Sequence, residues 1–243
     1  FDPMDPTSMR EPAPGYLNAL DRGIKGIRIG IDPEFCSADV DSEVSRAVLA
    51  AAEVLGELGA SIREVKFSHI EEAIGAWGVI FTAECGASHE AMYQSRAGDY
   101  SPAFRAFLEE AQKVRGVDYA RAHATRQVVL RMVDDLLQQV DLLLCPSMAL
   151  VAMELKGRPV EEVVTPEIGH KLLRFTSPFS LTGNPTISVP CGFTAEGLPV
   201  SMQLIGRQGA EDKVIEAGHA YEQATEWHNR SPAARLSHLS ADS

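Results

Sequence analysis

The pattern of apolar and polar residues predicts a strand, a helix and a second strand near the start of the chain. Ile27, Ile29 and Ile31 alternate with polar or small residues, as they would on a strand. Apolar residues over 44–58 then recur at helical spacing, and a glycine follows as a stop signal. Residues 62–67 predict another strand. A strand–helix–strand unit of this kind places its two strands parallel in one sheet.

The remaining pattern predicts a long helical region, a buried strand, a hairpin and a last helix. Residues 69–140 are mostly helical, and the clearest apolar stripe runs over 117–140. Residues 141–145 form a short apolar run that a proline closes, which is typical of a buried strand. Residues 147–170 hold prolines and few periodic apolar residues, so they predict mainly loop. The two hairpin strands and the last helix are expected at residues 186–190, 198–205 and from 210 onward.

This order of elements predicts an α/β fold, with a mixed β-sheet and flanking helices. Residues 1–23 are rich in Pro, Asp and Gly and are expected to form a connector, with one helical turn at Tyr16–Leu20. The tail 231–243 is expected to be frayed.

Charge and composition exclude several classes of protein. The formal net charge is −12, so a nucleic-acid binder or a protein of anionic membrane surfaces is not expected. No apolar run approaches the roughly 20 residues that a membrane-spanning helix needs, and residues 1–8 do not resemble a secretory signal. The four cysteines lie far apart without metal-type spacing, and we interpret them as buried thiols in a reducing cytoplasm.

No self-contained catalytic or metal site is visible in the sequence. It lacks GxGxxG after a strand, a Walker loop, HExxH and GxSxG. The seven histidines are scattered, and we interpret them as surface or structural residues. Adjacent acidic pairs such as Glu71-Glu72 and Asp134-Asp135 are best explained as solvated helix faces. The sequence alone therefore yields no catalytic residue and no metal ligand.

One stretch, residues 175–206, stands out by its order of turn and strand signals. Gly183 and Gly192 are natural positions for a positive φ. Pro190 removes a backbone donor, so the first hairpin strand should end there or lie at a sheet edge. These features predict a fold element, without indicating a reaction.

The same stretch resembles the C-terminal block of the amidase signature family. That block has a Phe-Thr pair, a Gly-x-Pro turn, an Ile-Ser-Val-Pro-like strand and a Gly-Leu-Pro-Val-x-x-Gln-Leu-Ile-Gly strand. Further similar segments cover the chain almost end to end: residues 2–8, 26–32, 141–147 and 220–228. The resemblance implies the amidase signature fold, with residues 24–230 as the C-terminal half of its domain.

Members of this family hydrolyse amides through a Ser-Ser-Lys constellation and an acyl-enzyme, without metal or cofactor. This sequence has no Ser-Ser dipeptide, and none of its six lysines lies in a matching context. We therefore carry over no catalytic residue, and neither Ser147 nor Ser188 is named as a nucleophile. The resemblance implies that a catalytic half, or another protein carrying it, is the partner of this chain. It also implies a small-molecule amide substrate, and it leaves a homo-oligomer open.

By the same resemblance, this half shapes the substrate pocket. An apolar or aromatic group beside the amide is expected to fit such a pocket. Simple packing in the core is the competing interpretation, above all for Trp77 and Phe81. The candidate substrate-binding residues are Pro146, Ser147, Met148, Phe175, Thr176, Phe179, Trp77 and Phe81.

Two alternatives to a hydrolase remain at this point. The A subunit of a tRNA-dependent amidotransferase shares the family chemistry. It usually has a Tyr-rich helix start and an Asp-containing Met-Tyr-Leu segment, where this chain has residues 117–123 and 167–174. That difference favours the hydrolase. The other alternative is a non-catalytic binding or scaffold protein derived from an amidase.

Overall fold

The computed structural model describes residues 1–5, 7–10 and 15–230 of the chain. The tail that the sequence predicts to be frayed lies outside these residues. The strands are β1 (Arg28–Ile31), β2 (Ser61–Glu64), β3 (Leu142–Pro146), β4 (Thr186–Phe193) and β5 (Pro199–Ile205). The helices are α1 (Ser42–Glu57), α2 (Ile70–Arg96), α3 (Pro102–Ala111), α4 (Gly116–Gln139), α5 (Val160–Val163), α6 (Pro166–Leu173), α7 (Ser177–Thr182) and α8 (Glu211–Ala224).

The strands form one mixed sheet in the order β2-β1-β3-β5-β4. β1 pairs in parallel with β2 and with β3, whereas β5 is antiparallel to both β3 and β4. The predicted α/β class, the mixed sheet and the hairpin are therefore confirmed. β2 and β4 are the edge strands, and β3 lies at the centre with every residue buried.

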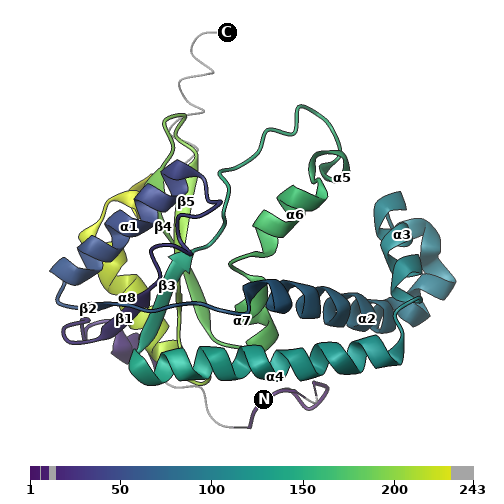
Figure 1. Cartoon of the computed structure of the whole chain (residues 1–243), viewed down its shortest axis with the longest axis horizontal. Coiled ribbons are helices and arrows are strands. Elements are labelled where there is room, and N and C mark those ends of the chain that lie inside the picture. The colour runs from purple at the N-terminus through teal and green to yellow at the C-terminus, as the bar shows by residue number, and fades with distance from the viewer. Residues whose placement is uncertain (6, 11–14, 231–243) are drawn as a thin grey trace.

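Helices cover both faces of this sheet (Figure 1). α1 and α8 pack on one face, where the backbone at Gly192 and Gly218 lets them come close. A Cβ built at Gly192 would lie 3.0 Å from the Ala47 side chain, and one at Gly218 would lie 3.0 Å from Ile187. On the other side of the sheet α4 contacts β3, and α7 packs against α2 and α4. α2 and α4 run side by side away from the sheet, and α3 packs on the far part of α2.

Residues 147–170 are mainly loop, as their sequence predicts, but they also contain α5 and the start of α6, which the sequence does not predict. Thr165 caps α6 by accepting a hydrogen bond from the amide of Ile168, and Pro166 occupies the first turn, where its missing N–H costs nothing. α6 is only eight residues long and is at most half-buried, so its few apolar residues, such as Ile168 and Leu172 at i, i+4 spacing, are too short a pattern to reveal a helix.

The first hairpin strand is also longer than predicted. Pro190 does lie on an edge strand, as expected, but β4 continues past it to Phe193. The pairing register with β5 shifts between Pro190 and Gly192, which is how the ladder passes the missing donor. Gly183 has the expected positive φ of 74°, whereas Gly192 does not, and close approach to α1 is its requirement instead.

Two further predictions concern the connector and the cysteines. A short 3-10 helix at Tyr16–Ala19 confirms the helical turn that the sequence predicts at Tyr16–Leu20. Cys36, Cys145 and Cys191 are buried, whereas Cys85 is only half-buried, and all four thiols are free. In the described part of the chain, no helix is long and apolar enough to cross a membrane.

Candidate functional site

The first group of predicted site residues, Pro146, Ser147 and Met148, lies at the end of β3, next to strand β5 of the hairpin. The amide of Ser147 donates to the carbonyl of Ser201 at 3.0 Å, which extends the pairing with β5 by one residue. The hydroxyl oxygen of Ser147 lies 3.0 Å from that of Ser188 on β4, and either group can donate. The backbone register thus brings two hydroxyls together across the intervening strand.

Gln203 of β5 joins the segments that surround these hydroxyls. Its side chain is 4% exposed, and it lies in register between Cys145 and Ser188. Its Nε2 donates to the carbonyl of Phe175 at 2.5 Å, and it lies 3.4 Å from the carbonyl of Pro146 and 3.3 Å from Sγ of Cys145. One buried amide therefore connects β3, β5 and the segment that leads into α7.

The turn after α7 is held by a second set of hydrogen bonds. Gly183 ends α7 in the left-handed region, which a residue with a side chain rarely adopts. The Thr182 hydroxyl donates to Oδ1 of Asn184 at 2.6 Å, and Nδ2 of Asn184 donates to the carbonyl of Gly206 at 2.8 Å. These bonds fix the start of β4 beside the end of β5.

Two clefts meet at Ser188, which lines both of them. The first, which we call the polar cleft, has a volume of about 380 Å³ and is lined by Thr176, Phe179, Ser180, Gly183, Asn184, Pro185, Thr186, Ser188, Gln203 and Glu211. The second, the apolar cleft, has a volume of about 360 Å³ and is lined by Val44, Ser147, Met148, Leu150, Val151, Ala152, Met153, Leu172, Ser188, Pro199, Val200 and Ser201. Neither lining set includes a lysine, arginine or histidine.

The structure places four of the predicted site residues in these clefts. Ser147 and Met148 line the apolar cleft, and Thr176 and Phe179 line the polar cleft. Pro146 is buried at the end of β3 and lines neither cleft, although Gln203 contacts its carbonyl. That the four residues touch a substrate stays a prediction.

The other three aromatic candidates lie apart from the clefts. Phe175 is fully buried, and its ring lies edge-on to that of Phe35 at 4.6 Å between centroids. Trp77 and Phe81 stack on each other along α2, with ring centroids 4.6 Å apart. Neither cleft is lined by any of these residues. Core packing is therefore the favoured interpretation for Phe175 and for the half-buried Trp77, whereas Phe81 is 44% exposed and belongs to neither the core nor a cleft.

Sequence reasoning misses two polar residues that the structure places at the centre of the site. Ser188 and Gln203 both lie within the motif that carries the family resemblance, so a signal is present in the sequence. Their importance becomes visible only through strand register, which sets Ser188, Gln203 and Cys145 side by side. Leu150, Val151 and Met153 are missed as well, because they come from a segment that predicts loop, and Leu172 is missed because α6 is not predicted.

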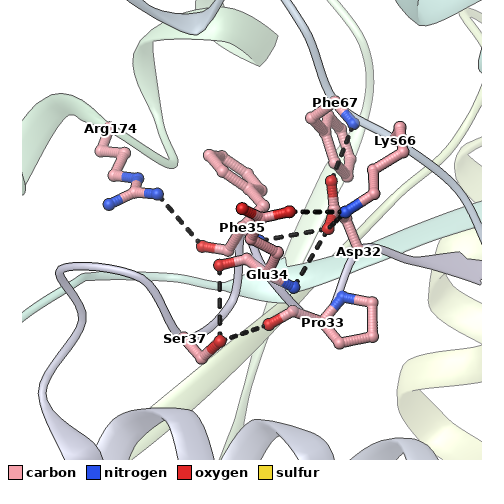
Figure 2. Close-up of polar contacts among 8 residues, drawn as sticks. All are labelled: Asp32, Pro33, Glu34, Phe35, Ser37, Lys66, Phe67 and Arg174. Atoms are coloured by element: carbon pink, nitrogen blue, oxygen red, sulfur yellow. Dashed lines mark hydrogen bonds and ion pairs between the residues drawn. The ribbon is translucent and has the colours of Figure 1, made fainter.

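The loop between β1 and α1 supports the buried aromatic rings beneath the site (Figure 2). Asp32, at the end of β1, is 3% exposed and accepts hydrogen bonds from the amides of Glu34, Phe35 and Phe67. Nζ of Lys66 lies 3.2 Å from the same carboxylate. These contacts tie the loop to the segment after β2, and so fix the ring of Phe35 against the core.

Arg174 connects this loop to the end of α6. Its guanidinium donates to the carbonyls of Ala38, at 2.5 Å, and Phe35, at 3.4 Å, and it lies over the Phe35 and Phe175 rings. Figure 2 shows the contact with the Phe35 carbonyl. These contacts hold Arg174, and with it the start of the 175–183 segment, against the loop between β1 and α1.

The electrostatics of the site do not activate a thiol nucleophile. Burial raises the pKa of the Cys36 thiol to about 12 and that of Cys191 to about 12. Burial likewise raises the pKa of Cys145 well above its usual value. These thiols are therefore protonated at neutral pH, and the thiolate is the reactive form. Among the described residues, no cluster of three or more His, Cys, Asp or Glu side chains is placed to hold a metal ion.

Comparison with characterised proteins identifies the family. The family model described as Amidase matches residues 1–215. An amidase from Pseudomonas putida is 37% identical over 96% of this chain and 50% of its own length. The A subunit of the glutamyl-tRNA(Gln) amidotransferase from Roseiflexus castenholzii is 32% identical over 96% of this chain and 51% of its own.

Solved structures show the same relationship. A bacterial aryl acylamidase of the amidase signature family superposes with a TM-score of 0.76 at 25% identity, over 94% of this chain and 49% of that one. The amidotransferase A subunit from Thermotoga maritima gives a TM-score of 0.73 at 26% identity, over 92% and 48%. The chain thus spans about half the length of the relatives it matches. Sequence, family model and fold agree that this chain belongs to the amidase signature family.

Proposed function

We propose that the chain works in an enzyme that hydrolyses a carboxylic amide to an acid and ammonia or an amine, through an acyl-enzyme. One observation carries the proposal beyond family membership. Two clefts, one polar and one apolar, meet at the Ser147–Ser188 hydroxyl pair, next to the segments that the family resemblance assigns to the substrate pocket. A polar amide with an apolar substituent matches such a pair of clefts.

In this proposal the chain supplies the substrate side and another segment supplies the catalytic groups. Residues 1–23 would then be the connector and residues 24–230 the C-terminal half of the amidase signature domain. The sequence has no Ser-Ser dipeptide, neither cleft has a lysine or histidine to act as base, and burial keeps three of the thiols protonated. A serine needs an adjacent base to attack an amide, so the hydroxyl pair alone does not meet that requirement.

The exposed side of β4 is the surface where we place the catalytic segment. Thr186 and Ser188 are exposed on this edge strand, and both line the polar cleft. An edge strand offers unpaired backbone groups that a further segment can complete. The four free thiols fit the reducing cytoplasm that we propose as its compartment.

The A subunit of an amidotransferase is the alternative function. Several relatives at 30–33% identity carry that name. The amidase from Pseudomonas putida is more similar, at 37% identity. This difference supports the hydrolase, in agreement with the motif differences in residues 117–123 and 167–174. A non-catalytic scaffold is the third candidate.

The proposed division of labour is tested by expressing the chain alone and together with the proposed catalytic segment. We expect ammonia release from benzamide only when both are present. The chain alone should not react with a fluorophosphonate probe. Labelling of the isolated chain would show that it has its own nucleophile. No hydrolysis of any amide by the combined protein would favour the scaffold, and glutamine-dependent transfer to a charged tRNA would favour the amidotransferase.

The pocket role of Phe179 has its own test. We expect Phe179→Leu to lower kcat/KM for benzamide about tenfold more than for acetamide, because Phe179 is the aromatic residue in the wall of the polar cleft and a change in the shape of a pocket wall costs a bulky substrate about 1–3 kcal/mol of discrimination. Phe193→Leu is the matched control, since Phe193 lines neither cleft. Equal effects of Phe179→Leu on both substrates would assign Phe179 to the core alone.

A further inference from the structure

The orientation of the Gln203 side chain leaves one of its atoms unused. Its Nε2 faces the carbonyls of Phe175 and Pro146, and both of those groups can only accept a hydrogen bond. The donor end of the amide is therefore fixed toward them. The acceptor end, Oε1, points elsewhere and makes no hydrogen bond to any residue that the structure describes.

This free oxygen belongs to a side chain that is almost completely buried and that lines the polar cleft. Oε1 is not among the fully enclosed unpaired atoms of the described residues, and because Gln203 lines the polar cleft, we infer that a ligand reaches Oε1 from there. An oxygen that solvent reaches is hydrated in the free protein. A ligand that brings an N–H donor into the cleft can replace that hydration with a direct hydrogen bond.

Two side-chain donors in the lining of the cleft are already committed to protein acceptors. The Thr176 hydroxyl donates to the carbonyl of Leu172 at 3.3 Å, and Nδ2 of Asn184 donates to Gly206. The Glu211 carboxylate lines the cleft too, and no hydrogen bond or ion pair to its side chain is recorded in the described part of the chain. The amide and carboxylate groups that the cleft offers to a ligand are therefore acceptors, beside the hydroxyls of Ser180, Thr186 and Ser188, which can accept as well as donate. Its lining has no cationic side chain.

We propose that the polar cleft is a binding site for a group that carries N–H donors, either a primary amide or a protonated amine, and that Oε1 of Gln203 accepts its hydrogen bond. The binding itself is independent of any reaction. Its use as the nitrogen-side subsite of an amide hydrolase rests on the proposed function. In that role, Gln203 would orient the nitrogen of the substrate while its own amide nitrogen holds the walls of the cleft in place.

The test varies the probe, so that the protein stays unchanged. Benzamide, benzylamine and N,N-dimethylbenzamide are titrated into the ¹⁵N-labelled 243-residue chain, and the side-chain NH₂ signal of Gln203 is followed by NMR. We expect saturable shifts with benzamide and benzylamine. N,N-dimethylbenzamide, which has no N–H, should bind about fivefold or more weakly, the loss expected for one hydrogen bond.

Variants separate the two acceptors. Gln203→Met should abolish the preference for N–H probes. Because this change also removes the contacts of Nε2, Glu211→Gln provides a second variant that breaks no recorded contact. It should weaken benzylamine more than benzamide, since only benzylamine is charged. The matched control is Glu222→Gln, on the same helix and about three turns away, which should change neither.

Equal affinity for the three probes, or saturable binding that leaves the Gln203 signal unmoved, would overturn the inference. If the combined enzyme then still hydrolysed amides, the proposed function would stand without it. Binding with the expected preference for N–H probes, in a protein that hydrolyses no amide, would contradict the proposed function but support the binding site in the polar cleft.

Discussion

At the scale of single residues, buried polar groups in this chain connect segments that are distant in sequence. Gln203 joins three segments through its amide nitrogen, and Asp32 joins two through its carboxylate. Such groups are tolerated in the interior because their hydrogen bonds offset the cost of leaving water. The same property makes them sensitive to substitution, since a lost partner leaves another polar group unpaired.

Asp32→Asn is expected to lower the free energy of unfolding by about 1–3 kcal/mol. Asparagine has an NH₂ group in place of Oδ1 or Oδ2, and this group cannot accept hydrogen bonds from the backbone N–H groups that the carboxylate now satisfies. Urea denaturation measures this change. Glu34→Gln is the control, because Glu34 contacts Lys66 on an exposed surface, where an ion pair contributes little. A loss of equal size in both variants would show that the backbone hydrogen bonds of Asp32 matter little.

A second carboxylate, Asp141, predicts how stability depends on pH. Hydrogen bonds from Arg28 hold the pKa of Asp141 at about 2, below its ordinary value of 3.8. Because folding lowers this pKa, the contribution of Asp141 is fully present above about pH 4 and is lost as the pH falls toward 2. We expect Asp141→Asn to cost about 1–2 kcal/mol at pH 7 after allowance for solvent screening.

The check is the difference in unfolding free energy between the wild type and Asp141→Asn, measured in urea from pH 7 to pH 2. It should be constant down to about pH 4 and should then shrink toward the acid end. A difference that stays constant over the whole range would mean that Arg28 does not stabilise the charged form of Asp141.

At the scale of elements, the sequence predicts those parts whose apolar spacing is regular. The residue spans of α1, α4 and β3 follow from such spacing, and the structure confirms them. The apolar pattern does not predict α6, because Ile168 and Leu172 in a helix of eight residues are too short a pattern to tell from loop. The pattern predicts β4 too short, because the register shift after Pro190 depends on pairing with β5.

The same limit applies to the site. Four of the eight candidate residues line the clefts, and they come from the ends of β3 and from the segment around α7, which the motif identifies. Gln203 and Ser188 could not be singled out without the strand register, and Leu172 could not without α6. Aromatic residues such as Phe175 look alike in a core and in a pocket when only the sequence is known.

The contact between α2 and α3 gives a prediction at the element scale. A Cβ at Gly86 would lie 2.7 Å from the Cβ of Ala111, which is closer than real side chains approach. Gly86→Ala should therefore destabilise the protein by about 1–3 kcal/mol, through overpacking. Gly78→Ala, on the same helix with nothing within 4 Å, should instead stabilise it by up to about 1 kcal/mol. The unfolding temperatures of both variants show whether packing or helix propensity dominates at each position. A Gly86→Ala variant that is more stable than the wild type would contradict the close approach of α2 and α3 at Gly86.

At the scale of the whole molecule, the two edge strands of the sheet differ in the charged residues that they carry. β2 is exposed along its length but consists of polar and charged residues apart from Ile62. β4 exposes Thr186 and Ser188 beside the clefts and carries no charged residue. Charged edges resist pairing with other strands, and uncharged edges invite it. The β4 edge is therefore the side where we expect association.

We expect the isolated chain to self-associate, and Thr186→Lys to reduce this association by placing a charge on the β4 edge. Sedimentation velocity over a concentration series measures the effect. Gln223→Lys is the control, because it adds the same charge at an exposed position on α8, away from the edge. A chain that stays monomeric at all concentrations, or equal effects of the two variants, would show that β4 is not the associating edge.

The separation of the two clefts has a practical consequence for protein engineering. Their lining sets have only Ser188 in common, and the apolar cleft takes much of its wall from residues 148–153, on the irregular chain after β3. Combinatorial libraries at Leu150, Val151 and Met153 would therefore reshape one cleft without touching the hydrogen bonds of Gln203. Acceptance of new substituents on one side of a ligand could then be evolved while recognition on the other side is retained.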